Sequence, residues 1–427
     1  MSDADGGSGG AVVDEIDEEE ARAEAERARA AAEIAPTASP AERVADWFRR
    51  VVLVPTLAIV SALFIGGVII VFTTPETLRA WGFFFDAPLR TLEMSFNLVI
   101  DSYSALLRFS LGSLNALGRT LREMTTLVFA GLSVALAFRA GLFNIGGSGQ
   151  ITVGAIGAAY VGFAIDGLPL IVHLPLALLV GFLSGAVWGG IAGFLKARTG
   201  AHEVITTIML NFIAQFLLLY LLKTEAFQRP GRDDPISPPV EEAARLPLFS
   251  DRFPAHWGFF LAILAAVAVW WLLRHTTIGF RMRAVGANPN AARYAGMSVG
   301  NTYTLSMGLA GGLAGLAGAN QLLGVPPSYS LSSPFGAASI GFDAIALALL
   351  GRASPAGVVA ASFLFAVLRT GATGMQSVTE TPVDIIVVIQ ALIIVFVAAP
   401  VLVQKIFRVR TARLGEGQTF ATNWGSA

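Results

Sequence analysis

The sequence predicts an all-α, polytopic bundle of transmembrane helices with about ten spans. Hydrophobic residues make up 54% of its 427 residues and charged residues only 14%, whereas an average soluble domain carries about 25% charged residues. The mean hydropathy is +0.66. At about 20 residues a span, the chain has room for roughly ten helices and a tail. Helices are expected because they satisfy their own backbone polar groups in lipid.

The N-terminal segment differs from the rest of the chain in charge. Residues 1–42 hold twelve acids and three arginines, a net charge of −9, which leaves +8 for residues 43–427. The segment has no apolar stripe to bury. We therefore predict an acidic, disordered cytoplasmic tail at 1–42, a transmembrane domain at 43–410 and a cytoplasmic C-terminal tail at 411–427. An acidic, long N-terminus is unlike a cleaved signal peptide, so the first span is expected to be an uncleaved anchor.

Ten apolar stretches define the expected spans. They lie at 51–73, 120–139, 144–165, 171–195, 203–222, 256–274, 300–323, 335–351, 355–374 and 383–403. The stretch at 335–351 is short and contains Asp343, which indicates a broken or partly buried helix. Bases concentrate on alternate connections, from Arg139 to Arg413, and the positive-inside rule makes those connections cytoplasmic. An even span count then puts both termini in the cytoplasm.

Two outer connections are too long to be simple turns. Residues 74–118 contain the string SFNLVIDSYSALLRF, whose apolar spacing predicts an amphipathic helix on the outer surface. Residues 223–255 are rich in proline and charge, which is typical of an outer loop or lid. Each could contact a soluble partner or be only a solvated loop.

Glycines recur at helical spacing in two spans. Gly181, Gly185, Gly189 and Gly193 form one ridge, and a second runs from Gly308 to Gly318. Small-xxx-small ridges let helices approach closely. They predict a tight bundle, packed within one chain or across a dimer.

The motifs of several enzyme classes are absent from the sequence. It has no Walker A pattern, no nucleophile elbow and no HExxH. It has no cysteine, and its four histidines are widely spaced. We therefore expect no enzymatic activity, no metal site and no cofactor bound by this chain.

The string GLFNIGGSGQ, residues 141–150, interrupts the apolar pattern between the second and third spans. Such a break is tolerated in lipid only beside protein or a watery cavity. Asn144 and Gln150 offer amide groups suited to hydroxyls or a heterocycle edge. With Phe143 they are candidates for a substrate path, and the alternative is a tight turn packed against neighbouring helices.

A polar stripe opens the fifth span. Thr207, Asn211 and Gln215 are four residues apart and share one helix face. Polar groups in a span are costly unless they face a cavity or another helix. The stripe therefore lines the path or bonds a neighbouring helix. Asn320, Gln321 and Asp343 complete the polar inventory that we assign to the spans, and they join the path candidates.

The inner connection after the sixth span contains signals for a short helix. Asn288 suits an N-cap, Pro289 suits the first helical position, and Gly296 suits the end of a helix over 289–295. Such an element can dock into a partner's groove, or it can be only a basic loop that fixes topology.

Several strings together resemble one family. GLFNIGGSGQ, EVITTIMLNFIA, the 279–296 loop, GFDAIALALLGRASPAGVV and QALIIVFVAAP are similar to permease subunits of ATP-binding-cassette (ABC) importers for nucleosides and simple sugars, within the branched-chain amino acid and ribose permease group. The resemblance covers about 95–403. It departs at Gly147-Ser148, where the family more often has a small residue followed by Glu.

The resemblance implies a type II ABC importer-like fold in the plasma membrane. It implies three protein partners: an ATPase that uses the ATP, a second permease that is related or identical, and an extracytoplasmic lipoprotein receptor. Beyond these we expect the lipid bilayer and no nucleic acid. By the same resemblance, the 279–296 loop couples to the ATPase, through Arg283, Gly286, Asn288, Pro289, Ala291, Ala292 and Gly296.

The predicted function is therefore import of nucleosides or simple sugars, driven by a separate ATPase. A secondary, ion-coupled transporter of small polar solutes is the alternative, although a single acid in the spans is little for a proton relay. A structural or signalling membrane protein is a third reading.

Overall fold

The computed structural model describes residues 48, 53–325, 329–333 and 335–408. The predicted tails at 1–42 and 411–427 lie outside these residues. Contacts divide the chain into a large unit, Leu57–Val403, and a second unit that takes in the two ends. The fold described below is that of the large unit.

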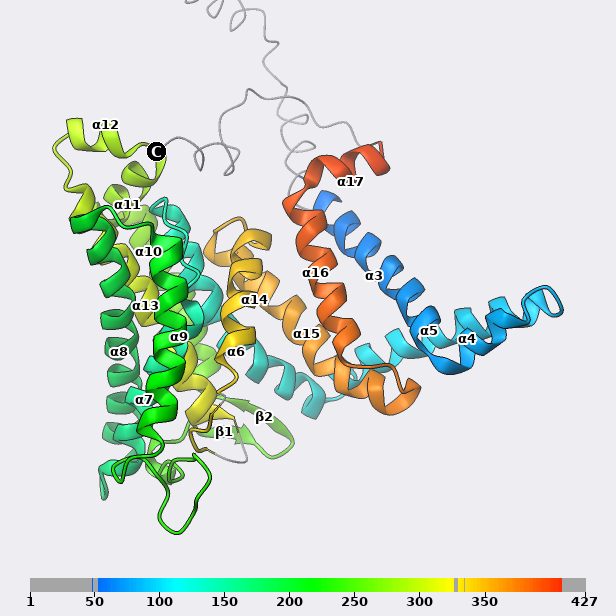
Figure 1. The fold of residues 1–427 in the computed structure, drawn as a ribbon, viewed down its shortest axis with the longest axis horizontal. Coiled ribbons are helices and arrows are strands. Elements are labelled where there is room, and N and C mark those ends of the chain that lie inside the picture. Colours follow the sequence, from blue (N-terminus) through cyan, green and yellow to red (C-terminus); the bar gives the residue numbers. More distant parts are fainter. Residues whose placement is uncertain (1–47, 49–52, 326–328, 334, 409–427) are drawn as a thin grey trace, which may run out of the picture. The chain divides into compact units, whose positions relative to one another are not determined.

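The large unit is built almost entirely from helices (Figure 1). In chain order the elements are α3 (Val54–Thr73), α4 (Pro75–Gly82), α5 (Pro88–Leu111), α6 (Leu114–Arg139), α7 (Gly147–Ala164), α8 (Leu170–Thr199), α9 (Glu203–Leu221), the 3₁₀ turn η2 (Glu242–Ala244), β1 (Leu248–Ser250), β2 (Phe253–His256), α10 (Gly258–His275), α11 (Thr277–Ala287), α12 (Pro289–Tyr294), α13 (Val299–Gly324), α14 (Ala337–Leu350), α15 (Pro355–Thr379), α16 (Asp384–Ala398) and α17 (Pro400–Ile406).

Six of these helices are long and apolar enough to cross a membrane: α3, α6, α8, α9, α10 and α15. α14 and α16 are shorter apolar helices. α7 and α13 coincide with predicted spans but fall outside the six, because glycine and polar residues lower their hydropathy. The short helix expected near 335–351 is α14, with 14 residues. The stretch at 383–403 is not one helix, since α16 ends at Ala398 and α17 begins at Pro400, whose ring cannot continue a helix.

The most extensive helix packing in the unit is among α7, α8 and α13, which run side by side (Figure 1). A Cβ added at Gly185 of α8 would overlap the carbonyl oxygen of Gly311 in α13, and one added at Gly154 of α7 would overlap Gly315. The backbones touch at these points. The two glycine ridges therefore pack against each other within one chain, as one of the two expected arrangements requires.

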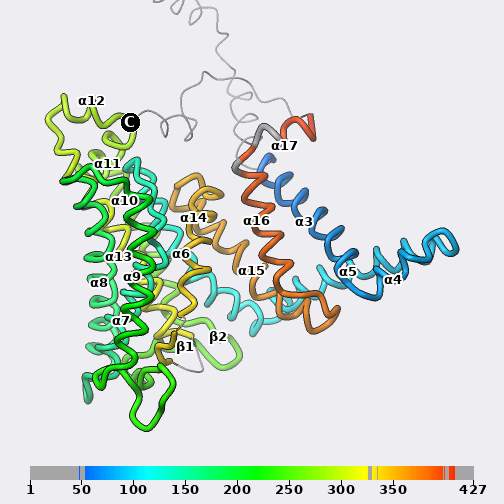
Figure 2. The backbone as a smooth tube through the Cα atoms, in the orientation of Figure 1, coloured from blue at the N-terminus to red at the C-terminus, as the bar shows by residue number. Residues whose placement is uncertain are grey.

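A second group of helices surrounds α6. Figure 2 traces α14 and α15 beside it, and both contact it. α5 packs on α15, where Gly371 and Gly374 leave room for Leu106 and Phe109. α5 supplies a helix within the predicted stretch 74–118, but the face that it buries carries mainly small polar side chains such as Ser95 and Ser102, while Leu89 and Phe96 are exposed. Its position at the membrane surface stays a prediction.

The connection at 223–255 is more ordered than the expected loop. β1 and β2 form an antiparallel hairpin, with Leu248 opposite His256. The backbone N–H of Glu241 donates to Gly162 at the end of α7, and that of Leu246 donates to Leu323 at the end of α13. The segment is therefore fastened to the bundle. Because β2 extends to His256, α10 begins two residues later than the predicted span.

Candidate functional site

The 141–150 segment folds into a compact turn, which we call the knot, and its two side-chain amides form hydrogen bonds with each other. Asn144 Nδ2 donates to Gln150 Oε1 at 2.9 Å, and Gln150 Nε2 donates back to Asn144 Oδ1 at 3.0 Å. Asn144 Oδ1 also accepts from the backbone N–H of Gly146 at 3.0 Å. Both side chains are buried. Glycines at 146, 147 and 149 let the chain turn into α7 while neighbouring elements approach.

The polar stripe of α9 is oriented toward this knot. Asn211 Oδ1 accepts from the backbone N–H of Gly149 at 2.7 Å, and its Nδ2 donates to the carbonyl of Ile145 at 2.9 Å. Thr207 is fully buried and packs against Gly146. Gln215, one turn further, is exposed. The first two members of the stripe therefore bond and pack against a neighbouring element, which is the helix-contact alternative.

The remaining path candidates lie in the segment before α7 and on α13. Phe143 stacks on Phe138, with ring centroids 5.2 Å apart. Asn320 is buried and its Nδ2 donates to Thr126 Oγ1 of α6 at 2.8 Å, while Thr126 Oγ1 donates to Gln321 Oε1 at 3.3 Å. Thr126 thereby joins α6 to α13.

Three charged side chains on three helices form a cluster that we call the charged triad: Glu123 of α6, Asp343 of α14 and Arg369 of α15. Arg369 Nη1 donates to Glu123 Oε1 at 3.0 Å, and Arg369 Nη2 is ion-paired with Asp343 Oδ2. Asp343 sits near the middle of α14 and Arg369 near the middle of α15. Asp343 is therefore not a single acid among the spans.

The triad corrects our polar inventory, which lacked Glu123 and Arg369. Both lie inside predicted spans, at 120–139 and 355–374, so their presence was visible in the sequence. An ionisable residue in a span is expected to have a partner. Applied to Asp343, that rule points to the few charged residues of the other spans, and these two are among them.

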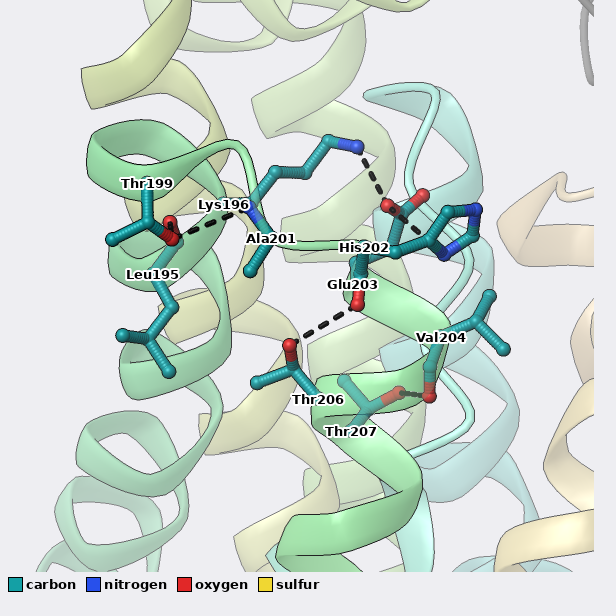
Figure 3. Close-up of polar contacts among 9 residues, drawn as sticks. All are labelled: Leu195, Lys196, Thr199, Ala201, His202, Glu203, Val204, Thr206 and Thr207. Carbon is teal, nitrogen blue, oxygen red and sulfur yellow. Dashed lines mark hydrogen bonds and ion pairs between the residues drawn. The ribbon is translucent and has the colours of Figure 1, made fainter. Parts of the chain in front are cut away.

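A second ion pair joins the end of α8 to the start of α9. Lys196 Nζ lies 2.6 Å from Glu203 Oε2, and Figure 3 shows the lysine side chain extending toward that carboxylate, with His202 beside it. The ring of Tyr303 in α13 lies 5.5 Å from Lys196 Nζ. Glu203 is buried. Lys196 of α8 therefore joins α9 through an ion pair and α13 through a cation–π contact, at one end of the bundle.

The 279–296 segment is more helical than the expected loop. Thr277–Ala287 forms α11, because Thr276 caps it and Met282 and Val285 bury one face. The predicted short helix is α12: Asn288 Oδ1 accepts from the N–H groups of Asn290 and Ala291, both at 3.0 Å. Gly296 has a φ of +78° and ends it.

Other members of the coupling set differ in exposure. Arg283, Pro289 and Ala291 are exposed, while Ala292 is buried against the segment's own small core. Tyr294 exposes 94% of its surface. Gly286 packs against the turn at 139–141. The segment thus presents one open face and anchors another on α6.

A groove of about 710 Å³ lies between the C-terminal half of α8 and the N-terminal half of α13. Small and apolar residues line most of this groove, and the polar side chains of Arg198 and Asn301 line the rest together with Thr304. It includes neither the triad nor the knot, so we do not assign the path to it. Within the described part of the chain, no group of three or more His, Cys, Asp or Glu side chains could hold a metal ion.

Comparison with known proteins gives a family match. The model of the family described as branched-chain amino acid transport system / permease component matches residues 116–398, from α6 to the end of α16. No solved structure matches the chain.

Three curated relatives match most of the chain. The guanosine ABC transporter permease protein NupP of Bacillus subtilis is 41% identical over 309 residues, 70% of this chain and 86% of the relative. The nucleoside ABC transporter permease protein NupB of Lactococcus lactis is 35% identical over 367 residues, 83% and 93%. The glucose ABC transporter permease protein TsgB13 of Haloferax volcanii is 34% identical over 354 residues, 80% and 86%.

Proposed function

The chain belongs to the branched-chain amino acid transport system permease family and is the permease subunit of an ABC importer for nucleosides or sugars, and we propose that it moves its solute by alternating access. The observation that carries this conclusion is the 41% identity with a guanosine permease over 86% of that relative's length. ABC permeases work with an ATPase subunit. We assign ATP use to that partner and no cofactor or enzymatic activity to this chain.

We propose ten spans: the six long apolar helices together with α7, α13, α14 and α16. An even number of spans puts both termini on the same side of the membrane, and the concentration of bases on the connections of that side supports the cytoplasm. In this topology, residues 1–42 and 411–427 are cytoplasmic tails of a membrane domain at 43–410. The arrangement is that of a type II ABC importer in the plasma membrane.

We propose that α11 and α12 carry the contact with the ATPase. α12 is exposed except at Ala292, and α11 presses on the turn that leads from α6 into the knot. The knot contacts α9 through the hydrogen bond between Gly149 and Asn211. It contacts α14 where Gly341 packs against Ser148. Movement of α12 would therefore reach helices that surround the charged triad through contacts between backbones.

The proposed path follows from which polar groups remain available. Asn144, Gln150, Thr207 and Asn211 are engaged with their neighbours, so we give them the role of shaping the path. Asp343, Gln215 and Gln321 remain partly or fully exposed and are the better candidates for contact with solute. A second permease, related or identical, and an extracytoplasmic lipoprotein receptor complete the proposed importer.

The experiment is ATP-driven uptake in proteoliposomes that contain the chain, its ATPase, a second permease and the receptor. Asn288→Pro, which removes the cap of α12, and deletion of 286–296 should abolish uptake while receptor binding persists. Normal uptake in either variant would contradict the coupling role. Uptake by the chain alone under a proton gradient would instead favour a secondary transporter, for which the triad supplies paired ionisable groups.

A further inference from the structure

A cluster of three charged side chains such as the charged triad is uncommon among membrane-spanning helices. Three ionisable side chains lie partly buried on α6, α14 and α15, where apolar packing would hold the helices at least as well. One carboxylate would neutralise Arg369, yet two face it. The second acid leaves the triad with a net charge of −1. Neutralisation of Arg369 therefore does not account for both acids.

The carboxylates also keep bonding capacity. Arg369 engages Oε1 of Glu123 and Oδ2 of Asp343; within the described residues, Glu123 Oε2 and Asp343 Oδ1 have no hydrogen-bond or ion-pair partner. The side chains are 31% exposed for Glu123, 18% for Asp343 and 22% for Arg369. They are therefore partly accessible at the surface of the bundle. Arg369 has five N–H donors, so it can donate further bonds as well.

We propose that the charged triad is the hydroxyl-binding part of the solute site, and that it takes the vicinal hydroxyl pair of a ribose or pyranose ring. This inference rests on the proposed function. The two free carboxylate oxygens accept from neighbouring hydroxyls, and the remaining Arg369 donors bond the hydroxyl oxygens. Ribonucleosides carry such a pair in cis and glucose carries adjacent pairs in trans, so both classes of solute offer neighbouring ring hydroxyls to the site.

The test compares solutes that differ only in these hydroxyls. Proteoliposomes with the complete importer are assayed with guanosine against 2′,3′-dideoxyguanosine, which lacks both ring hydroxyls. For each protein the preference is the ratio of kcat/KM for the hydroxylated solute to that for its deoxy analogue. The same receptor serves wild type and variants, so its contribution cancels when their preferences are compared.

Glu123→Gln and Asp343→Asn should each lower the preference by about tenfold or more, the scale of one charged hydrogen bond. The fall should come from the hydroxylated solute, with uptake of the deoxy analogue changed less than about threefold. Glu203→Gln is the matched control, because it removes an acid from an ion pair at the inner end of the bundle. It should leave the preference unchanged.

A structural role is separated by comparing the two solutes within each single variant. If the triad only joins helices, loosening it lowers uptake of guanosine and of its dideoxy analogue to the same extent, and the preference keeps its wild-type value. Equal losses for both solutes overturn the inference. If the wild-type importer takes up no nucleoside and no sugar, the proposed function itself fails; if it takes them up and neither variant changes the preference, only this site fails.

Discussion

The backbone of Gly286 in α11 lies directly against the backbone of Gly141, which is held at a φ of +72° just after α6. A Cβ added at Gly286 would overlap the carbonyl oxygen of Arg139 and lie 2.9 Å from the nitrogen of Gly141. No side chain separates the two segments. The contact therefore joins the proposed coupling segment to the knot as one backbone against another.

Gly286→Ala should reduce ATP-driven uptake by roughly tenfold, since overpacking a tight contact costs about 1–3 kcal/mol and here displaces α11. Binding of the ATPase should persist, because the exposed face of α12 is untouched. Uptake and co-purification of the ATPase are measured together. Gly82→Ala is the control, since nothing lies within 4 Å of its added Cβ. Wild-type uptake in Gly286→Ala would show that the contact can yield without consequence.

The ridge between α8 and α13 gives a prediction about stability. At Gly185 and at Gly311, an added Cβ would overlap the other residue's carbonyl oxygen. Gly185→Ala should therefore lower the melting temperature in detergent, at a cost of about 1–3 kcal/mol. Gly190→Ala is matched in helix and substitution, but the atom nearest to its added Cβ is 4.0 Å away. Equal melting temperatures for the two variants would argue against close packing at Gly185.

The knot can be tested as a paired unit. Asn144→Ala leaves the buried amide of Gln150 without its partner, which should cost about 1–3 kcal/mol of stability. The double variant with Gln150→Ala should cost less than the two single effects added together, because the single variants remove the same pair. Thermal unfolding of all four proteins measures this. Gln215→Ala, on an exposed position of α9, is the control. If the two losses of stability simply add in the double variant, Asn144 and Gln150 contribute to stability independently.

Local patterns predicted the parts of the fold that depend on neighbours in sequence. Asn288, Pro289 and Gly296 defined α12 closely, because caps and helix ends are set within a few residues. Apolar stretches located each long helix for a similar reason. α11 was missed, since its bases made the segment resemble a loop, although Met282 and Val285 bury one face.

The site depended on contacts that no local pattern contains. Arg369 is 246 residues from Glu123, and their pairing requires α6 and α15 to be adjacent. The stripe on α9 was visible, but the sequence could not decide whether Asn211 faces a cavity or Gly149. Only the position of α7 decides that. Polar residues in spans were thus predictable as a set, and their partners were not.

The last prediction concerns His256, at the end of β2. Its side chain is fully buried, between Gly258 and Gly324, and within the described residues neither ring nitrogen has a hydrogen-bond partner. Burial, with a smaller contribution from the positive charge of Arg122, lowers the pKa of this histidine from 6.5 to about 4. The folded protein therefore holds a neutral ring at pH values where the unfolded chain binds a proton.

A lowered pKa fixes the sign of the effect. Above pH 6.5 both states carry a neutral ring, and between 6.5 and about 4 only the unfolded state binds the proton, so the free energy of unfolding falls as pH falls through that window. From pH 7.5 to pH 5 the loss should be about 2 kcal/mol. Melting temperatures in detergent at these two pH values should differ less in His256→Gln than in wild type, while His275→Gln, at an exposed position, should keep the wild-type difference. If His256→Gln keeps that difference too, another group is responsible for the pH dependence, and the β1–β2 hairpin is not held by a neutral histidine.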